Sequence, residues 1–295
     1  MTRAFPLLVL SLALVACAGR QPEWRIESPP EPVTQPAEPE ANPVDPVALG
    51  DARWAERTDP QNVREAIAHW EGVVATEPSH AEVLVKLTHA YYFLADGYLR
   101  HDEDAYLDAL EAGLHWGEQA MVASSPEFAA AMAADAKYPD AVAQVGEQGV
   151  PAMFWYATAL GKWAKKQGFA VMLRHKDNIK VTMERVLTLD PTFLGGAPHT
   201  YFGVFYAVAP AIAGGDLDKS REHFEAALEI SPDVLSTRVL WAAELAVKTQ
   251  DEATFDRLLD EVLKADADAI PRIAAENRVE QQKARELQAR RDEFF

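Results

Sequence analysis

Two segments of the sequence combine aromatic side chains with small residues in a way that suits the binding of a small molecule. The first spans residues 154–163, where alanine, threonine and glycine among the rings would let a neighbouring helix approach closely. The second spans residues 194–206 and starts near the pair Gly195 and Gly196. A glycine pair followed by proline at an expected helix start leaves backbone N–H groups free, with a partial positive charge beside them.

These two segments have two interpretations. In the first, the rings wall a pocket or groove for an apolar or amphipathic ligand, whose polar head meets the glycine turn. In the second, the rings pack between neighbouring helices and carry no ligand, as aromatic side chains commonly do in protein cores. The sequence alone leaves both interpretations open.

Catalytic side chains are not grouped with any spacing that a known chemistry requires. The sequence contains no glycine-rich phosphate loop with a following lysine, no H-E-x-x-H and no G-x-S-x-G. Its eight histidines are scattered without metal-ligand spacing, and acidic pairs such as Asp102 and Asp104 fall in a polar stretch. We therefore expect no catalytic site, no metal site and no cofactor.

Residues 1–16 are expected to be a lipoprotein signal peptide. A basic residue, Arg3, precedes an apolar run over residues 5–16, which is shorter than the about 20 residues that a membrane-spanning helix needs. The run leads into LVAC at residues 14–17, which resembles the bacterial lipobox, where the cysteine sulfur is lipidated before cleavage. In the alternative interpretation, Cys17 is an incidental apolar residue of an uncleaved or ordinary signal.

Lipidation would explain why an exported chain has a single cysteine, because an unpaired thiol is unusual in an oxidising compartment. Several acyl chains would hold the protein at the periplasmic face of a bacterial membrane. Ala18, in place of aspartate, favours the outer membrane. Residues 17–47 are rich in proline and glutamate, which predicts a disordered tether that reaches about 90 Å at most and holds the folded part well off the membrane.

The charge of the chain excludes one class of partner. With 28 basic and 46 acidic residues, the net charge is −18, whereas proteins that bind nucleic acid use clustered lysine and arginine to contact phosphates. An acidic surface is also a poor match for anionic lipid headgroups, so we expect membrane contact to come from the lipid alone. We therefore predict no nucleic-acid partner.

Apolar residues recur at three- and four-residue spacing along residues 48–270, which predicts an all-α domain. One pattern occurs three times: a small or apolar residue, a large one four positions later, an apolar one three later, and proline five later. The three copies are Ala66, Trp70, Val73 and Pro78; Ile179, Met183, Val186 and Pro191; and Ser220, Phe224, Ala227 and Pro232. This pattern is typical of the second helix of a tetratricopeptide repeat.

The repeat is divergent. A degenerate fourth copy occurs at Gly113, Gly117 and Ala120, and a fifth helix pair is expected over residues 235–265. Residues 126–150 contain glycines and prolines that break the period, which predicts an inserted helical or loop element. Residues 271–295 are mostly charged and are expected to form a C-terminal capping helix, with an assembly helix as the alternative. The predicted fold is therefore a tetratricopeptide-like array of four or five helical hairpins.

With these motifs together, the chain resembles the TRAP-transporter T-component family, whose members are lipid-anchored periplasmic tetratricopeptide proteins. The resemblance rests on the lipobox cysteine, on FWYATALGKW at 154–163, on GGAPHTYFG at 195–203, and on the block over 214–247. It covers most of residues 62–265, whereas 126–150 and the tail after residue 271 match no motif of the family.

The resemblance implies an accessory role in tripartite ATP-independent periplasmic uptake. It implies a periplasmic solute-binding protein as partner, a homotrimer, and a cavity for a hydrophobic small ligand. Carried over to this sequence, the candidate lining comprises Trp155, Trp163, Gly195, Gly196, His199, Tyr201, Phe202 and Tyr206. Two other functions are weighed against it: a generic repeat scaffold lipoprotein in cell-envelope assembly, and an enzyme, for which no nucleophile and base can be named.

Overall fold

Helices form all the regular structure in the part of the chain that the computed structural model describes, residues 20–26 and 45–295. This confirms the predicted all-α class. The first helices are α1 (Pro46–Ala55), α2 (Pro60–Thr76), α3 (Ala81–Phe93), the π-helical turn η1 (Leu94–Leu99) and α4 (Glu103–Ser124). After an insertion come α7 (Val150–Gln167), α8 (Phe169–Leu189), α9 (Phe193–Val208) and α10 (Leu217–Ile230). The array ends with α11 (Leu235–Leu240), the π-helical η4 (Trp241–Ala246), α12 (Val247–Thr249) and α13 (Glu252–Lys264).

Consecutive helices pack as pairs, with α1 against α2, α3 against α4, α7 against α8, α9 against α10, and α11 to α12 against α13. These five pairs in the described residues agree with the four or five hairpins expected from the sequence. Five of the described helices begin after an aspartate whose side chain accepts a hydrogen bond from an amide of the first turn, which stabilises a helix start. These aspartates are Asp45, Asp59, Asp102, Asp216 and Asp251.

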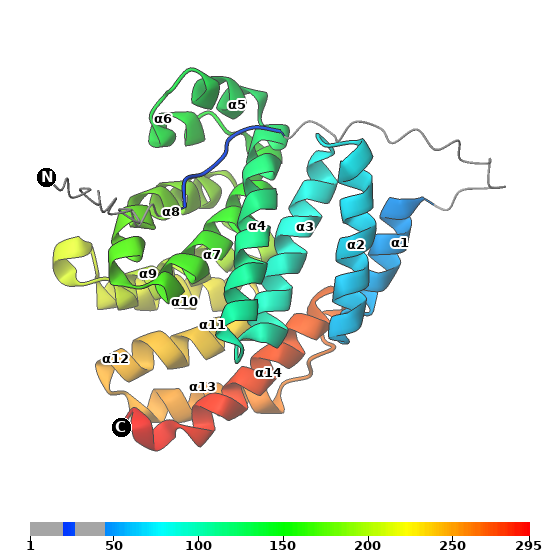
Figure 1. Cartoon of the computed structure of the whole chain (residues 1–295). Helices are drawn as coiled ribbons and strands as arrows, with labels where there is room; N and C mark the ends of the chain where they lie inside the picture. The colour runs from blue at the N-terminus through cyan, green and yellow to red at the C-terminus, as the bar shows by residue number, and fades with distance from the viewer. Residues whose placement is uncertain (1–19, 27–44) are drawn as a thin grey trace, which may run out of the picture.

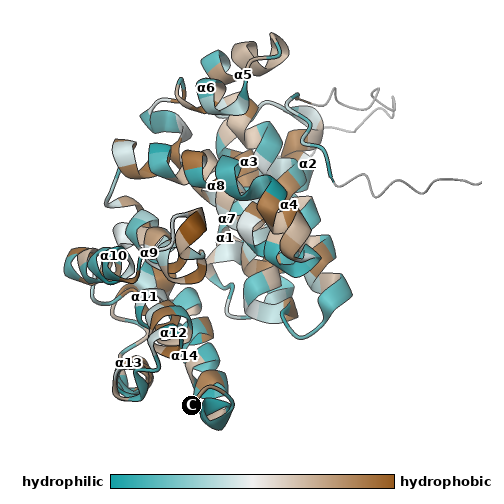
Figure 2. Ribbon diagram, turned by 90° about the vertical axis from the view of Figure 1, so that its left-hand side faces the viewer, coloured by the Kyte–Doolittle hydropathy of each residue, from teal (hydrophilic) through white to brown (hydrophobic). Residues whose placement is uncertain are grey.

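The sequence pattern marks the buried face of α2, α8 and α10. Its nine apolar or small positions are all at most 5 % exposed: Ala66, Trp70, Val73, Ile179, Met183, Val186, Ser220, Phe224 and Ala227. Residues three and four apart lie on one side of a helix, so a single face can be buried while the rest stays polar. Figure 2 shows this mixture of hydrophobic and hydrophilic residues along the individual helices.

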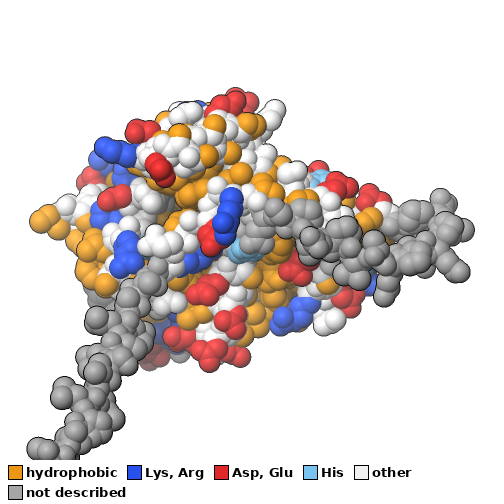
Figure 3. Space-filling view, turned by 45° about the horizontal axis from the view of Figure 1, so that its top comes forward, with side chains coloured by type: hydrophobic (Ala, Val, Ile, Leu, Met, Phe, Trp, Pro, Cys, Tyr) orange, Lys and Arg blue, Asp and Glu red, His pale blue; other side chains and the backbone are white. Residues whose placement is uncertain are grey.

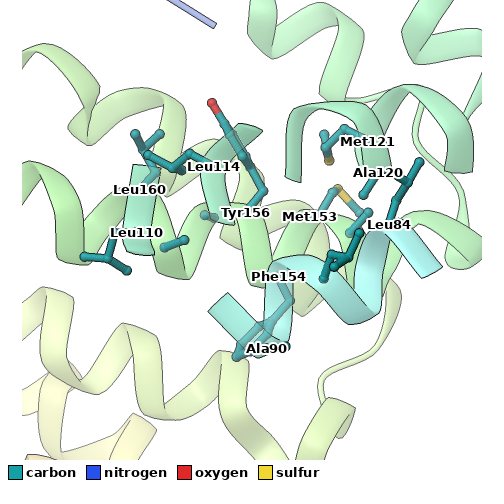
Figure 4. Packing of buried hydrophobic residues seen from close by; sticks show 14 of the residues in the cluster. Leu84, Ala90, Leu110, Leu114, Ala120, Met121, Met153, Phe154, Tyr156 and Leu160 are labelled. Carbon is teal, nitrogen blue, oxygen red and sulfur yellow. The ribbon is translucent and has the colours of Figure 1, made fainter. Parts of the chain in front are cut away.

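The degenerate fourth copy lets α4 lie between two other helices. A Cβ atom on Gly113 would lie 3.3 Å from the side chain of Tyr91 in α3, and one on Gly117 would lie 3.1 Å from Tyr156 in α7. Glycine at these positions therefore permits the close approach of both neighbours. The apolar side chains that α3, α4 and α7 bury between them form the centre of the larger core (Figure 4).

The predicted inserted element contains α5 (Pro126–Ala133), α6 (Tyr138–Val142) and the short 3-10 turn η2 (Glu147–Gly149). It packs against α4 and α8 and forms the top of the molecule in Figure 1. The Tyr138 hydroxyl lies 2.8 Å from that of Thr182, and Arg185 donates to the carbonyl of Val145 at 2.9 Å. The insertion is thus held to α8 by hydrogen bonds as well as by apolar packing.

The charged C-terminal segment forms the 3-10 turns η5 (Pro271–Ile273) and η6 (Arg291–Glu293) with α14 (Ala274–Ala289) between them. On one side, α14 packs on the last pair of the array, where the Asn277 side chain accepts a hydrogen bond from the Leu235 amide at 3.2 Å. On the other side, it reaches the first helices (Figure 1). Glu276 pairs there with Arg57 at 2.7 Å.

Three distant parts of the chain meet at Asp96 of η1. Its carboxylate lies 2.8 Å from the ammonium group of Lys162 in α7 and 2.5 Å from that of Lys283 in α14, which also contacts Glu280 at 2.7 Å. Burial alone would raise the pKa of the Asp96 carboxyl, but the two lysines hold it well below its ordinary value. The first, middle and last parts of the array are therefore joined by one partly buried charge cluster.

Residues 20–26 form part of the folded domain, although they fall inside the predicted tether 17–47. The Trp24 ring packs against Phe128, Tyr138 and Tyr156, with ring centroids 5.1, 5.4 and 5.3 Å apart. The segment runs from α8 towards the top of α4 (dark blue in Figure 1). The sequence interpretation missed this docking because one tryptophan among prolines and glutamates does not alter the composition of the segment.

A buried carboxylate also holds this segment. Glu118 of α4 is 1 % exposed and pairs with Arg20, while it accepts a hydrogen bond from the Glu23 amide at 2.9 Å. The predicted signal peptide, Cys17 and the part of the tether over 27–44 lie outside the described residues. Among the helices that are described, none combines the length and the hydrophobicity needed to cross a membrane.

Replacing Asp96 with asparagine should destabilise the fold by about 1–3 kcal/mol, because Lys162 and Lys283 would lose a shared, partly buried counter-ion and Lys283 would keep only Glu280. The free energy of unfolding from urea titrations measures this. Asp260→Asn is the control: Asp260 pairs with Lys264 at the surface at 3.1 Å, so we expect a change of at most about 0.5 kcal/mol. Equal, small effects of the two substitutions would contradict the importance of the cluster.

Replacing Trp24 with alanine should release the N-terminal segment, because its packing against three rings would be lost. Trypsin cleavage after Arg20 should then become several-fold faster, while the thermal unfolding of the array changes little. Glu23→Gln is the matched control, since its side chain pairs with the exposed Arg25 and its backbone hydrogen bond to Glu118 is retained. Unchanged cleavage in Trp24→Ala would show that Trp24 does not hold the segment.

Candidate functional site

Trp155 of α7 lies against two half-buried aromatic residues of α3. Its ring is stacked on the His89 ring, with centroids 3.7 Å apart and an angle of 12° between the planes. The Tyr92 ring is 5.5 Å away, tilted by 44°. Because all three are only partly buried, their rings form an aromatic surface that is still in reach of solvent.

The same two helices place charged groups one to two turns further along. Tyr92 and Asp96 are four residues apart along α3 and η1, and Trp155 and Lys162 are seven apart on α7, so each pair shares one helix face. We call His89, Tyr92, Asp96, Trp155 and Lys162 the α3–α7 strip. It is aromatic at one end and ionic at the other.

Helix α14 borders this strip along its length. At the aromatic end, a Glu276 oxygen lies 3.9 Å from the Nε2 atom of His89. At the ionic end, Lys283 contacts Asp96 at 2.5 Å. Space is left on the α7 side, since a Cβ atom added to Gly161 would meet no other atom within 4 Å. The strip therefore combines residues of α3 and η1 with residues of the distant α7, and α14, still further along the sequence, lies beside it.

The electrostatics of the strip separate its two ends. Burial, and then the nearby charge of Arg57, lowers the pKa of His89 to about 3, so its ring is neutral at physiological pH. Burial, and then Asp96, raises the pKa of Tyr92 well above its ordinary value. The aromatic end is thus uncharged. At the other end, Lys162 carries a charge and its side chain is 35 % exposed, which suits the binding of an amphipathic molecule rather than a reaction.

Trp163, the second predicted tryptophan, lies away from the strip. Its side chain is 3 % exposed, and its indole N–H donates to Glu111 of α4 at 3.0 Å. The His175 ring of α8 lies 5.8 Å from it. Trp163 therefore joins α7 to its two neighbours, in agreement with the packing interpretation of the aromatic segments.

The glycine turn at the start of α9 is a packing device in this structure. Leu194, Gly195 and Gly196 all have positive φ angles, of 48°, 74° and 86°, which glycine adopts without strain. Both glycine amides donate to the carbonyl of Thr192, at 2.9 and 3.2 Å. The free N–H groups expected from the sequence are therefore used within the turn, which corrects that expectation.

A Cβ atom on either glycine would also meet the neighbouring pair of helices. On Gly195 it would lie 2.9 Å from the Val234 side chain, and on Gly196 it would lie 3.2 Å from the Cα atom of Ala227 in α10. The turn thus brings α9 directly against α10 and the loop that follows it. The two glycine amides are therefore not free to bind the polar head of a ligand.

Three of the other predicted residues face α10. The Nδ1 atoms of His199 and His223 are 3.0 Å apart, and burial lowers the pKa of both rings. The Tyr206 ring is stacked on His223 at 5.5 Å, and the Phe202 ring lies 5.4 Å from His223. Tyr201 lies instead near Glu184 of α8: burial, and then the charge of Glu184, raises the pKa of its hydroxyl. His199, Phe202 and Tyr206 therefore form a second aromatic cluster, centred on His223.

The predicted lining residues therefore fall into separate places, and only Trp155 lies on the strip. Two surface hollows of about 270 and 180 Å³ lie elsewhere and contain none of the predicted residues. Sequence reasoning missed His89, Tyr92, Asp96, Lys162 and Lys283. The three- and four-residue spacing from His89 to Tyr92 and Asp96 is the signal that could have found half of the strip. Over the described residues, no three histidine, cysteine or acidic side chains are grouped as metal ligands.

Two comparisons with known proteins show what this sequence is similar to. The chain is 30 % identical over 117 residues to an uncharacterized protein of Treponema pallidum (strain Nichols), a match that covers 38 % of this chain. The chain spans about a third of the length of that relative, 35 %. A family model described as TRAP transporter T-component matches residues 56–295, which include α2 to α14 and the complete α3–α7 strip. The chain therefore belongs to the TRAP transporter T-component family.

Proposed function

We propose that this protein is the non-enzymatic accessory component of a tripartite ATP-independent periplasmic uptake system, and that it binds the solute-binding protein of that system. The family match over residues 56–295 carries this proposal. A lipid on Cys17 would hold the protein at the periplasmic face of the membrane, the outer membrane in a Gram-negative cell. Helical repeat arrays commonly present extended surfaces that bind protein partners.

The proposal includes a hydrophobic ligand on the α3–α7 strip. Stacked, uncharged rings at Trp155, His89 and Tyr92 suit an apolar chain, and the partly exposed side chain of Lys162, whose ammonium group pairs with Asp96, suits an acidic or polar head. The other predicted lining residues would not contact the ligand in this arrangement; they would hold the helices around the strip in place. Trp163 fixes α7 against α4, and the turn at Gly195 and Gly196 fixes α9 against α10.

A separate surface supports contact with other proteins, including further copies of this chain in the proposed homotrimer. Three apolar side chains near the turn between α9 and α10 are exposed: Val208 at 47 %, Ile212 at 100 % and Leu217 at 41 %. Apolar residues gathered in one place on a surface commonly mark protein interfaces. The 3-10 turn η3 (Ala211–Ala213) holds Ile212 at the tip of this surface.

Purification of the full-length protein from detergent-treated membranes should recover a periplasmic solute-binding protein and, by native mass spectrometry, a bound apolar molecule. A Cys17→Ser variant should appear in the soluble periplasmic fraction while it still binds the same partner. Recovery of neither partner nor ligand would contradict both parts of the proposal. Recovery of envelope-assembly proteins instead would favour a scaffold lipoprotein.

Trp155→Ala should weaken the binding of an anthroyloxy-labelled fatty acid by about tenfold, which corresponds to about 1.4 kcal/mol, because the ligand would lose its largest aromatic contact. Fluorescence titration measures the dissociation constant. Trp116→Ala, at a half-buried tryptophan of α4 away from the strip, is the matched control and should bind as the unsubstituted protein does. Equal affinities for the two variants would remove the strip as the ligand site.

A further inference from the structure

The turn between α7 and α8 is unusually basic for an acidic protein. Residues 162–176 contain five basic side chains and no acidic one, in a chain of net charge −18. The five are Lys162, Lys165, Lys166, Arg174 and Lys176. Lys162 belongs to the charge cluster at Asp96, and the other four lie in the last turn of α7 and the first two turns of α8. This stretch therefore carries a local positive charge, although the chain as a whole is strongly negative.

Large apolar side chains are exposed in the middle of this basic stretch. Phe169 is 79 % exposed and Leu173 is 51 % exposed. They are four residues apart in the first turns of α8, so they project from one side of the helix. Gly168, with a φ of 101°, lets the chain reverse just before them. In Figure 3, hydrophobic side chains likewise lie exposed among charged ones on the face shown.

The basic side chains around Phe169 remain available to a charged surface. Lys165 contacts Glu244 at 3.1 Å and Lys166 contacts Glu103 at 3.7 Å, but these lysine side chains are 63 and 40 % exposed. Such exposed ion pairs are weak and exchange readily with other partners. Lys176 pairs with Asp177 at 2.6 Å, whereas Arg174 is exposed and forms no ion pair within the described ranges 20–26 and 45–295.

The docked segment 20–26 leads towards this same end of α8. Trp24 is stacked on Tyr138, whose hydroxyl contacts Thr182 in the second half of α8. Arg20 lies near enough to His175, in the first half of α8, for its charge to contribute to lowering the pKa of that histidine, after burial and Arg174. Read backwards from Trp24 to Arg20, the chain therefore runs towards the start of α8, where Phe169 lies.

We propose that the α7–α8 turn, residues 165–176, rests on an anionic phospholipid surface with Phe169 and Leu173 inserted among the headgroups. The inference rests on the proposed lipidation of Cys17. Cys17 is only three residues before Arg20, a span of about 10 Å at full extension, so the acyl chains would enter the membrane near this turn. Apolar side chains flanked by lysine and arginine are the usual composition of an interfacial contact.

This arrangement differs from the one expected from composition, in which lipid alone touches the membrane and a long tether separates it from the domain. The docking of residues 20–26 shortens the connection, and the turn supplies a second contact. Two contacts fix an orientation where one would leave the domain free to rotate. The domain would then lie on the membrane by the α8 side, with α1 on the opposite side of the array (Figure 1).

A labelled cysteine tests this contact, because lipidation would occupy the single natural thiol. Phe169→Cys is labelled with nitrobenzoxadiazole in the full-length lipidated protein, which is then reconstituted on phosphatidylglycerol and phosphatidylethanolamine vesicles. Leu49→Cys is the matched control, at an apolar α1 residue that is 38 % exposed. On vesicles, emission from position 169 should shift to the blue and iodide quenching should fall several-fold, with neither change at position 49.

The outcomes separate this inference from the proposed function. A protein that does not float with vesicles lacks the lipid anchor, which overturns the anchor and this contact together. A protein that floats, but whose label at 169 is as accessible to iodide as the label at 49, retains its anchor and overturns the contact alone. A shift that is equally large on phosphatidylcholine vesicles would overturn the role of anionic headgroups.

Discussion

Asp96 keeps its charge inside the protein because lysines 66 and 187 residues further along the chain both reach it. A buried carboxylate without such partners would take up a proton or draw water into the core. The requirement for both lysines fixes where α7 and α14 lie relative to η1, and the same contacts build the ionic end of the α3–α7 strip. Architecture and candidate binding site therefore depend on one cluster, in which Lys162 is the member most open to solvent.

Much of the array could be predicted from the sequence because its cause is local. Positions such as Ala66, Trp70 and Val73 repeat at three- and four-residue spacing, and the spacing itself selects the buried face. The divergent copy at Gly113 and Gly117 also has a local signal, since two glycines in one helix mark a close approach of its neighbours. Assignment of these pairs to the tetratricopeptide class stays a prediction.

The site was less predictable because its parts come from distant segments. Trp155 was named from its own segment, but its partner His89 lies 66 residues earlier, and no local pattern pairs them. Conversely, Trp163 and the glycine turn looked open in sequence and are occupied by Glu111 and Thr192. Sequence shows which side chains are able to bind, whereas packing decides which of them are still free.

The position of α14 has a consequence for the order in which the protein can be completed. An ordinary helical array can add and fold one pair after another, since each repeat contacts only its neighbours. Here α14 joins the first pair to the last, and its contacts with Arg57 and Asp96 connect residues 219 and 187 positions apart. The earlier helices therefore lack their closing contacts until α14 (Ala274–Ala289) has docked, so the final architecture cannot form pair by pair from the first helix onward.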